Sequence, residues 1–250
     1  MLLRDATFKR TIVLVFALGL VPAAGAQTNK ATEVVNAMVS ALGGQAFLEV
    51  KEIQATGKAF GFKGTRSVGS EVFLDYIKFP DKERIERGTY RIKPTSIYNG
   101  ESGWEVNDKK VETVAAATAK EFQNAFKSGF QYVSRFVLNR PGLALLHAGS
   151  EMIDYKRNDV IEFRDSGTFY RLFVDQQSHL PTKIQVRRNG ETFLREEQFA
   201  NWHEFQGMPT ALFVIHYKDG VKNMEVRFDN VIYNPGLSDS LFAAPTPGSK

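Results

Sequence analysis

The chain contains 250 residues, with 32 basic and 28 acidic side chains, no cysteine and a hydrophobic fraction of 43%. The lack of cysteine excludes a disulfide framework, a cysteine-ligated zinc or iron–sulfur site and a thiol nucleophile. Charged residues make up 24% and aromatic residues 12% of the chain, which is too apolar a composition for intrinsic disorder, so we expect a folded protein.

The first 26 residues have the pattern of a secretory signal peptide. Three basic residues precede an apolar run over residues 11–21, and Ala24-Gly25-Ala26 then provides small residues in the A-x-A arrangement of a cleavage site. An uncleaved membrane anchor is the alternative, but the run is shorter than the ~20 residues that span a bilayer. We predict cleavage before Gln27. Because Gln27 is not a cysteine, the exported product is expected to be soluble and not itself a lipoprotein.

Half of the net charge of +4 belongs to residues 1–26. The charge that remains on residues 27–250 gives no reason to expect a nucleic-acid partner. We predict a signal peptide over residues 1–26 and a single domain over residues 27–250, located in the periplasm.

A helix is expected at the start of the exported chain. Its apolar stripe follows a period of 3.6 residues and is formed by Ala31, Val34, Val35, Met38, Val39 and Leu42. Thr28 or Asn29 could cap this helix, and Gly43-Gly44 ends it. A short helical turn is expected within residues 45–50.

From about residue 52 apolar and polar residues alternate, as in a strand. The first stripe consists of Ile53, Ala55, Gly57 and Ala59. Residues 71–78 are apolar on both faces, with Val72, Leu74 and Tyr76 on one and Phe73 and Ile77 on the other. Further strands are predicted over residues 84–91, 95–98 and 103–106.

Residues 112–147 are expected to interrupt the strands with helix. Residues 114–127 are rich in alanine and place Phe122 and Phe126 at i and i+4. Gly129 separates this helix from a second one over residues 132–138, which a Pro-Gly sequence ends.

The rest of the chain predicts a meander of strands, over residues 151–155, 159–164, 168–175, 182–188, 192–199, 210–218 and 221–233. Turn-forming sequences such as Ser166-Gly167, Asn189-Gly190 and Asp219-Gly220 separate them. We therefore predict an α+β fold, with a large antiparallel sheet of about ten strands, an N-terminal helix and a mid-chain helical insertion that covers one face.

The motifs of common enzymes are missing. The chain has no G-x-S-x-G nucleophile motif, and His203-Glu204 lacks the second histidine of a zinc-binding H-E-x-x-H motif. No two of the four histidines stand at metal-ligand spacing. Carboxylate pairs such as Glu196-Glu197 are expected on solvent-facing sides of strands. We expect no enzymatic activity, no metal and no cofactor.

Strands that are apolar on both faces leave two interpretations open. The sheet can curl around a cavity for an apolar ligand, or it can have an ordinary thick core.

The order of short motifs over residues 31–245 resembles that of the LolA/LolB-type periplasmic lipoprotein carriers and of outer-membrane lipoprotein-sorting proteins. The motifs that carry this resemblance are Leu42-Gly43-Gly44 followed by residues 50–57, Phe79-Pro80-Asp81-Lys82, residues 98–104 (YNGESGW), Phe173-Val174-Asp175 with Leu180-Pro181, residues 199–209 (FANWHEFQGMP), and residues 231–235 with 241–245 (VIYNP and LFAAP).

This resemblance implies a strongly curved, incomplete β-barrel that helices close on one side and whose hydrophobic cavity receives acyl chains. Seven aromatic residues are our candidates for the lining of the cavity: Phe73, Tyr76, Phe122, Phe126, Phe130, Phe173 and Phe213. We expect residues 114–138 to act as a lid, with hinges at Ser128-Gly129 and Pro141-Gly142.

Our hypothesis is a monomeric carrier of lipoprotein acyl chains or other envelope lipids, which exchanges its cargo with partners in the inner or outer membrane. The resemblance also allows a non-enzymatic envelope sensor or scaffold whose cavity is filled by side chains. An exported hydrolase assembled from distant Asp, Glu and His residues is the least favoured alternative.

Overall fold

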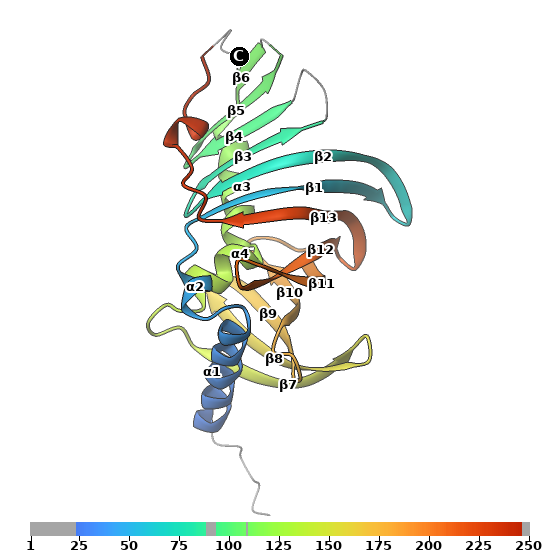
Figure 1. Cartoon of the computed structure of the whole chain (residues 1–250). Helices are drawn as coiled ribbons and strands as arrows, with labels where there is room; N and C mark the ends of the chain where they lie inside the picture. The colour runs from blue at the N-terminus through green and yellow to red at the C-terminus, as the bar shows by residue number, and fades with distance from the viewer. Residues whose placement is uncertain (1–23, 89–93, 109, 247–250) are drawn as a thin grey trace, which may run out of the picture.

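The computed structural model of the chain describes residues 24–88, 94–108 and 110–246. Most of the predicted signal peptide, residues 1–23, lies outside the described residues. The fold is one antiparallel sheet of 13 strands in the order β6-β5-β4-β3-β2-β1-β13-β12-β11-β10-β9-β8-β7. The sheet bends strongly but does not close, because its order ends at β6 and at β7 (Figure 1).

The strands of the first half of the chain are β1 (Glu52–Lys63), β2 (Arg66–Lys78), β3 (Lys82–Arg87), β4 (Thr95–Asn99), β5 (Ser102–Asn107) and β6 (Lys110–Thr113). The second half contributes β7 (Leu145–Ile153), β8 (Lys156–Asp165), β9 (Thr168–Asp175), β10 (Pro181–Arg187), β11 (Arg195–Phe205), β12 (Met208–Lys218) and β13 (Val221–Tyr233). Neighbouring strands in the sheet are also consecutive in the chain, except that β13 returns to pair with β1.

The helices are α1 (Ala24–Ala41), α2 (Gln45–Leu48), α3 (Ala116–Ser128) and α4 (Phe130–Tyr132), and α4 continues into a π-helical turn over Val133–Val137. A 3-10 turn over Asp239–Phe242 precedes the C-terminus. Helix α1 lies beside β7, at one end of the sheet, while α3 and α4 lie across the middle (Figure 1).

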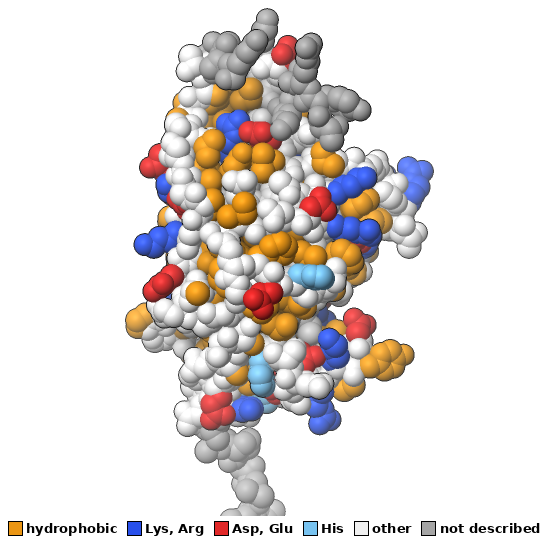
Figure 2. All heavy atoms as spheres, viewed as in Figure 1, with side chains coloured by type: hydrophobic (Ala, Val, Ile, Leu, Met, Phe, Trp, Pro, Cys, Tyr) orange, Lys and Arg blue, Asp and Glu red, His pale blue; other side chains and the backbone are white. Residues whose placement is uncertain are grey.

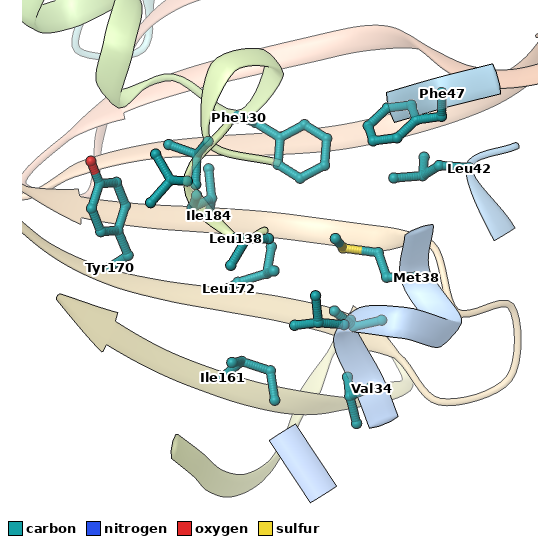
Figure 3. Close-up of a cluster of buried hydrophobic side chains, with 14 of the residues drawn as sticks. Val34, Met38, Leu42, Phe47, Phe130, Leu138, Ile161, Tyr170, Leu172 and Ile184 are labelled. Atoms are coloured by element: carbon teal, nitrogen blue, oxygen red, sulfur yellow. The ribbon is translucent and has the colours of Figure 1, made fainter. Parts of the chain in front are cut away.

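The main core fills the space between the inner, concave face of the sheet and the helices. The apolar stripe predicted for the N-terminal helix is buried there, with Met38 at 0% and Leu42 at 1% exposure. Figure 3 shows these two side chains close to Phe47 of α2 and directed towards Leu172 and Ile184 of the sheet. Because the stripe spans three helical turns, α1 is fixed along one side of the sheet.

The outer, convex face is also partly covered. The segment after β13 crosses β3 and β4, where Phe242 and Ile97 are both buried. Asn99 and Arg84 hold this segment by donating to the carbonyl oxygens of Phe242 and Leu241. This segment, the C-terminal strap, therefore covers part of the outer face of β3 and β4, while the inner face of the sheet carries the main core.

The predicted fold class is confirmed, with local differences. The sheet has 13 strands rather than about ten. Strand β6 was not predicted, and β7 begins at Leu145, within the region predicted as helical, rather than at residue 151. Helix α1 begins at Ala24, so Thr28 lies within the helix and is not its cap. The turn between β7 and β8 falls at Asp154-Tyr155, both with positive φ, instead of around Asn158.

Candidate functional site

A cavity of about 660 Å³ lies between the inner face of the sheet and the mid-chain helices. Strand β1 provides part of the space, because it presents Ala55 and Ala59 to the cavity, where larger side chains would fill it. The ring of Phe73 packs directly over Gly57, and a Cβ atom at that position would come within 2.8 Å of it. The volume is in the range of pockets that hold a small ligand.

Aromatic rings form most of the cavity wall. Phe73 and Phe228 meet edge to face, with ring centroids 5.8 Å apart, and Phe130 and Phe199 lie 4.8 Å apart. Trp202 continues this row beside Phe199, at 6.4 Å. In Figure 2, hydrophobic side chains gather across the middle of the molecule, at the level of β11 to β13. The wall can therefore contact a hydrocarbon chain over much of its length.

Four of the seven aromatic residues that we selected from the sequence lie at this cavity: Phe73, Phe122, Phe126 and Phe130. Tyr76, Phe173 and Phe213 are not among its lining residues. Because side chains alternate along a strand, Tyr76 is on the opposite face of β2 from Phe73. Phe173 is buried beneath Arg171 and Lys183, and Phe213 lies under Arg227, all on the outer face.

Helix α3 closes the cavity and is held at several points. The rings of Phe122 and Tyr98 stack in parallel, 3.7 Å apart, and the Gln123 amide donates to the Asp81 carbonyl at 2.9 Å. On the other side of the helix, Glu121 accepts a hydrogen bond from Arg188 at 2.5 Å. Ala119, Gln123 and Ser128 are buried beneath this helix of 13 residues, and most of its other side chains are exposed.

The junction between α3 and α4 is at Gly129. This residue has extended dihedral angles, φ −71° and ψ 156°, which residues other than glycine also adopt. The Glu197 carboxylate accepts a hydrogen bond from the Phe130 amide at 3.3 Å, and so ties the junction to β11. The predicted hinge thus coincides with a break between two helices, although not with a conformation that requires glycine.

Arg135 is a buried cation that the sequence analysis did not single out. It is 5% exposed, donates to the Phe47 carbonyl at 3.0 Å and stacks on the Phe47 ring at 4.0 Å. Burial lowers the pKa of Arg135 to about 10. The residue therefore joins the π-helical turn to α2 at the edge of the cavity.

The cavity wall also contains acidic residues that the sequence analysis did not select. Asp75 and Glu83 lie on the inner faces of β2 and β3, and the Arg87 guanidinium is on the same face. Burial raises the pKa of Asp75 to about 7, and burial together with the neighbouring Asp75 raises the pKa of Glu83 well above its usual value. The sequence pattern could have indicated that Asp75 faces inwards, since alternation places it between the inward-facing Phe73 and Ile77.

His216 lines the cavity as well, opposite Glu197 in the register of β11 and β12. Burial lowers the pKa of His216, so its imidazole is neutral at pH 7. Within the described residues no group of three or more His, Asp or Glu side chains is arranged to hold a metal ion. No helix among them is long and apolar enough to cross a membrane.

These features define an open, strongly bent antiparallel sheet, with helices over its concave face and an apolar cavity between the two. This is the fold of the LolA-type lipoprotein-sorting proteins, and the resemblance found in the sequence is confirmed at the level of the fold.

Three solved structures illustrate the likeness. An outer membrane lipoprotein-sorting protein domain from Vibrio parahaemolyticus has a TM-score of 0.58 at 14% sequence identity, covering 86% of this chain and 97% of that one. A DUF1329 family protein from Desulfovibrio piger gives 0.59 at 13% identity, with 87% and 97% covered. A LolA superfamily protein from Nitrosomonas europaea gives 0.53 at 12% identity, with 88% and 97% covered.

No protein-family model and no curated protein matches the chain by sequence.

Proposed function

We propose that this protein is a periplasmic carrier that shelters the acyl chains of lipoproteins or other envelope lipids, and that it has no catalytic role. The observation that supports this proposal best is the cavity of about 660 Å³, whose wall is formed mainly by aromatic and aliphatic side chains. The fold that the chain shares with lipoprotein-sorting proteins agrees with it.

The driving force for binding would be the transfer of hydrocarbon out of water. Each buried CH₂ group contributes ~0.8 kcal/mol, so an acyl chain that is only partly enclosed can still bind with useful affinity. The small residues Ala55 and Ala59 would leave room for the chain, and the rings of Phe130 and Phe199 would pack along it.

Helix α3 would serve as the lid of the cavity. It contributes Phe122 and Phe126 to the wall, and contacts of Glu121 and Phe122, near its middle, hold it in place. A bend at Ser128-Gly129 would let α3 move away from the cavity while the buried π-helical turn and the 13-stranded sheet stay in place.

We further propose that residues 1–26 are removed on export, that residues 27–250 form a single domain, and that the carrier is a monomer that meets its delivery partners at the inner or outer membrane. Cleavage before Gln27 would shorten α1 by three residues. It would keep the whole buried stripe of this helix, which starts at Ala31.

The proposal is tested by purifying the exported protein from periplasm and analysing it by native mass spectrometry and lipid extraction. A carrier yields a lipid-bound mass, or binds a fluorescent acyl probe after delipidation with one site per chain. Two variants provide the contrast: Ala55→Trp fills the cavity and abolishes probe binding, whereas Thr56→Trp adds the same ring on the outer face and leaves binding intact. If wild-type protein carries no lipid and binds no probe, the fold serves a sensor or scaffold here.

A further inference from the structure

We propose that the cavity selects amphiphiles whose polar end carries a protonated primary amine, and that the carboxylates of Asp75 and Glu83 bind this ammonium group. The inference rests on the proposed function, since it assigns the polar end of a ligand whose hydrocarbon chain occupies the same cavity.

The two carboxylates belong to one small area of the cavity wall. In the pairing of β2 with β3, Asp75 lies opposite Ile85 and Glu83 lies opposite Ile77. The two acids are therefore diagonal neighbours on the same face, within reach of a single group placed between them. Both line the cavity, together with the two isoleucines.

The Asp75 carboxylate is incompletely satisfied. Its Oδ1 atom is buried and has no hydrogen-bond partner among the described residues. A buried acceptor without a donor costs free energy, and each such atom in a folded protein requires an explanation. A donor supplied by a ligand in the adjoining cavity would provide the missing hydrogen bond.

The cation nearest to the two acids has other partners. Arg87 donates to the Ser96 hydroxyl at 2.6 Å, and its Nε lies 3.5 Å from a carboxylate oxygen of Glu71. The Ser96 hydroxyl in turn donates to Glu105 at 2.9 Å. The guanidinium is thus directed to Ser96 and Glu71, and acts on Asp75 and Glu83 only through its longer-range charge.

The charged side chains of the described residues in this area are therefore four acids, Glu71, Asp75, Glu83 and Glu105, and one base, Arg87. Burial raises the pKa of Asp75, and burial together with the neighbouring Asp75 raises the pKa of Glu83, although the charge of Arg87 opposes both shifts. A ligand cation between them would favour their ionised forms, because an opposite charge at close range stabilises a carboxylate. A ligand carboxylate in the same place would be repelled.

The choice of a primary amine follows from hydrogen bonding. An ammonium group of this kind has three donors on one compact cation, which suits two carboxylates on adjacent strands. A quaternary ammonium group has the charge but no donor, and so cannot satisfy Oδ1 of Asp75. An alcohol can donate one hydrogen bond but has no charge.

The test is a competition experiment with the delipidated protein at pH 7.5. Dodecylamine, dodecyltrimethylammonium, dodecanol and dodecanoate, all with the same hydrocarbon chain, displace a fluorescent acyl probe, and their affinities are compared. We expect dodecylamine to bind at least ~10-fold more tightly than dodecanol, which corresponds to about 1.4 kcal/mol, and dodecanoate to bind most weakly. Dodecyltrimethylammonium is expected between the amine and the alcohol.

Variants assign the preference to the two acids. In Asp75→Asn and in Glu83→Gln the ratio of amine to alcohol affinity is expected to fall towards one. The matched control is Glu86→Gln, also on β3 but paired with Arg84 on the outer face, and it is expected to keep the wild-type ratio.

The outcomes separate the two proposals. Equal affinities of the wild-type protein for amine and alcohol would overturn the amine site and leave the carrier intact. The same is true of a preference that persists in both Asp75→Asn and Glu83→Gln. Failure of the probe and of all four amphiphiles to bind would overturn the carrier, and the amine site with it.

Discussion

Replacing Asp75 by asparagine is expected to stabilise the fold at neutral pH and to change it little near pH 4. The carboxyl is buried against an apolar cavity, and burial raises its pKa to about 7. In the unfolded chain an aspartate has a pKa of about 3.9. The folded state therefore holds a proton that the unfolded state releases, and stability falls as the pH rises between these two values.

The magnitude follows from the size of the shift. One pKa unit corresponds to about 1.36 kcal/mol, so a shift of roughly three units makes the asparagine variant up to ~4 kcal/mol more stable than the wild type above pH 7. Near pH 4 the wild-type carboxyl is protonated in the folded state, and the two proteins differ little. Glu83 acts in the same direction, since its pKa is also raised.

The assay is urea unfolding of both proteins between pH 4.5 and pH 8, followed by the extrapolated free energy of unfolding. Carboxyls whose pKa is lowered in the fold, such as Glu225 and Asp159, have the opposite pH dependence and contribute equally to both proteins. The difference between the two proteins therefore isolates Asp75. A difference that stays constant over this range would refute the burial of this carboxyl.

Four further substitutions probe the architecture. Gly57→Ala would bring a Cβ atom to 2.2 Å from the Arg227 carbonyl oxygen, and thermal unfolding is expected to show that the free energy of unfolding falls by ~1–3 kcal/mol. The control is Gly129→Ala, whose Cβ atom meets nothing closer than 3.4 Å and which is expected to change this free energy by less than about 0.5 kcal/mol. Phe242→Ala removes a fully buried ring beneath the C-terminal strap and is expected to cost ~3–5 kcal/mol in urea titrations; a cost below ~1 kcal/mol would show that the strap is not packed as described. Glu121→Gln removes the ion pairs of α3 with Arg188 and Arg195. Stopped-flow measurements are expected to show faster uptake and release of an acyl probe, while the melting temperature of the protein stays almost unchanged. Unchanged rates would argue against α3 as the lid.

Much of the sheet could be predicted from the sequence, because alternation and turn-forming sequences act together. The strands over residues 168–175 and 221–233 have the predicted bounds, since a Ser-Gly or Asp-Gly turn fixes at least one end of each. Strand β6 was missed because its four residues, Lys110–Thr113, are mostly exposed and carry no apolar stripe. An edge strand of this kind depends on its neighbour for its structure, which short-range patterns do not reveal.

The candidate site could be predicted only in part, for a related reason. Alternation shows which residues share a face of a strand, but not which face is turned inwards. Phe73 and Tyr76 were both selected, although they point to opposite sides of β2. Phe213 was selected for its size and lies outside, beneath Arg227. Asp75 was not selected, although alternation places it between Phe73 and Ile77; the pairing of β2 with β3 shows that the cavity lies beside it.

The two tryptophans allow a direct measurement of whether hydrocarbon chains enter the cavity beneath α3. Trp202 lines the cavity, whereas Trp104 on β5 is not among the residues around it. In single-tryptophan variants, Trp104→Phe and Trp202→Phe, a fatty acid with bromine atoms on its chain is added, and tryptophan fluorescence is recorded. If acyl chains occupy the cavity, we expect saturable quenching of Trp202 and no quenching of Trp104. Equal quenching of both, or of neither, would contradict it.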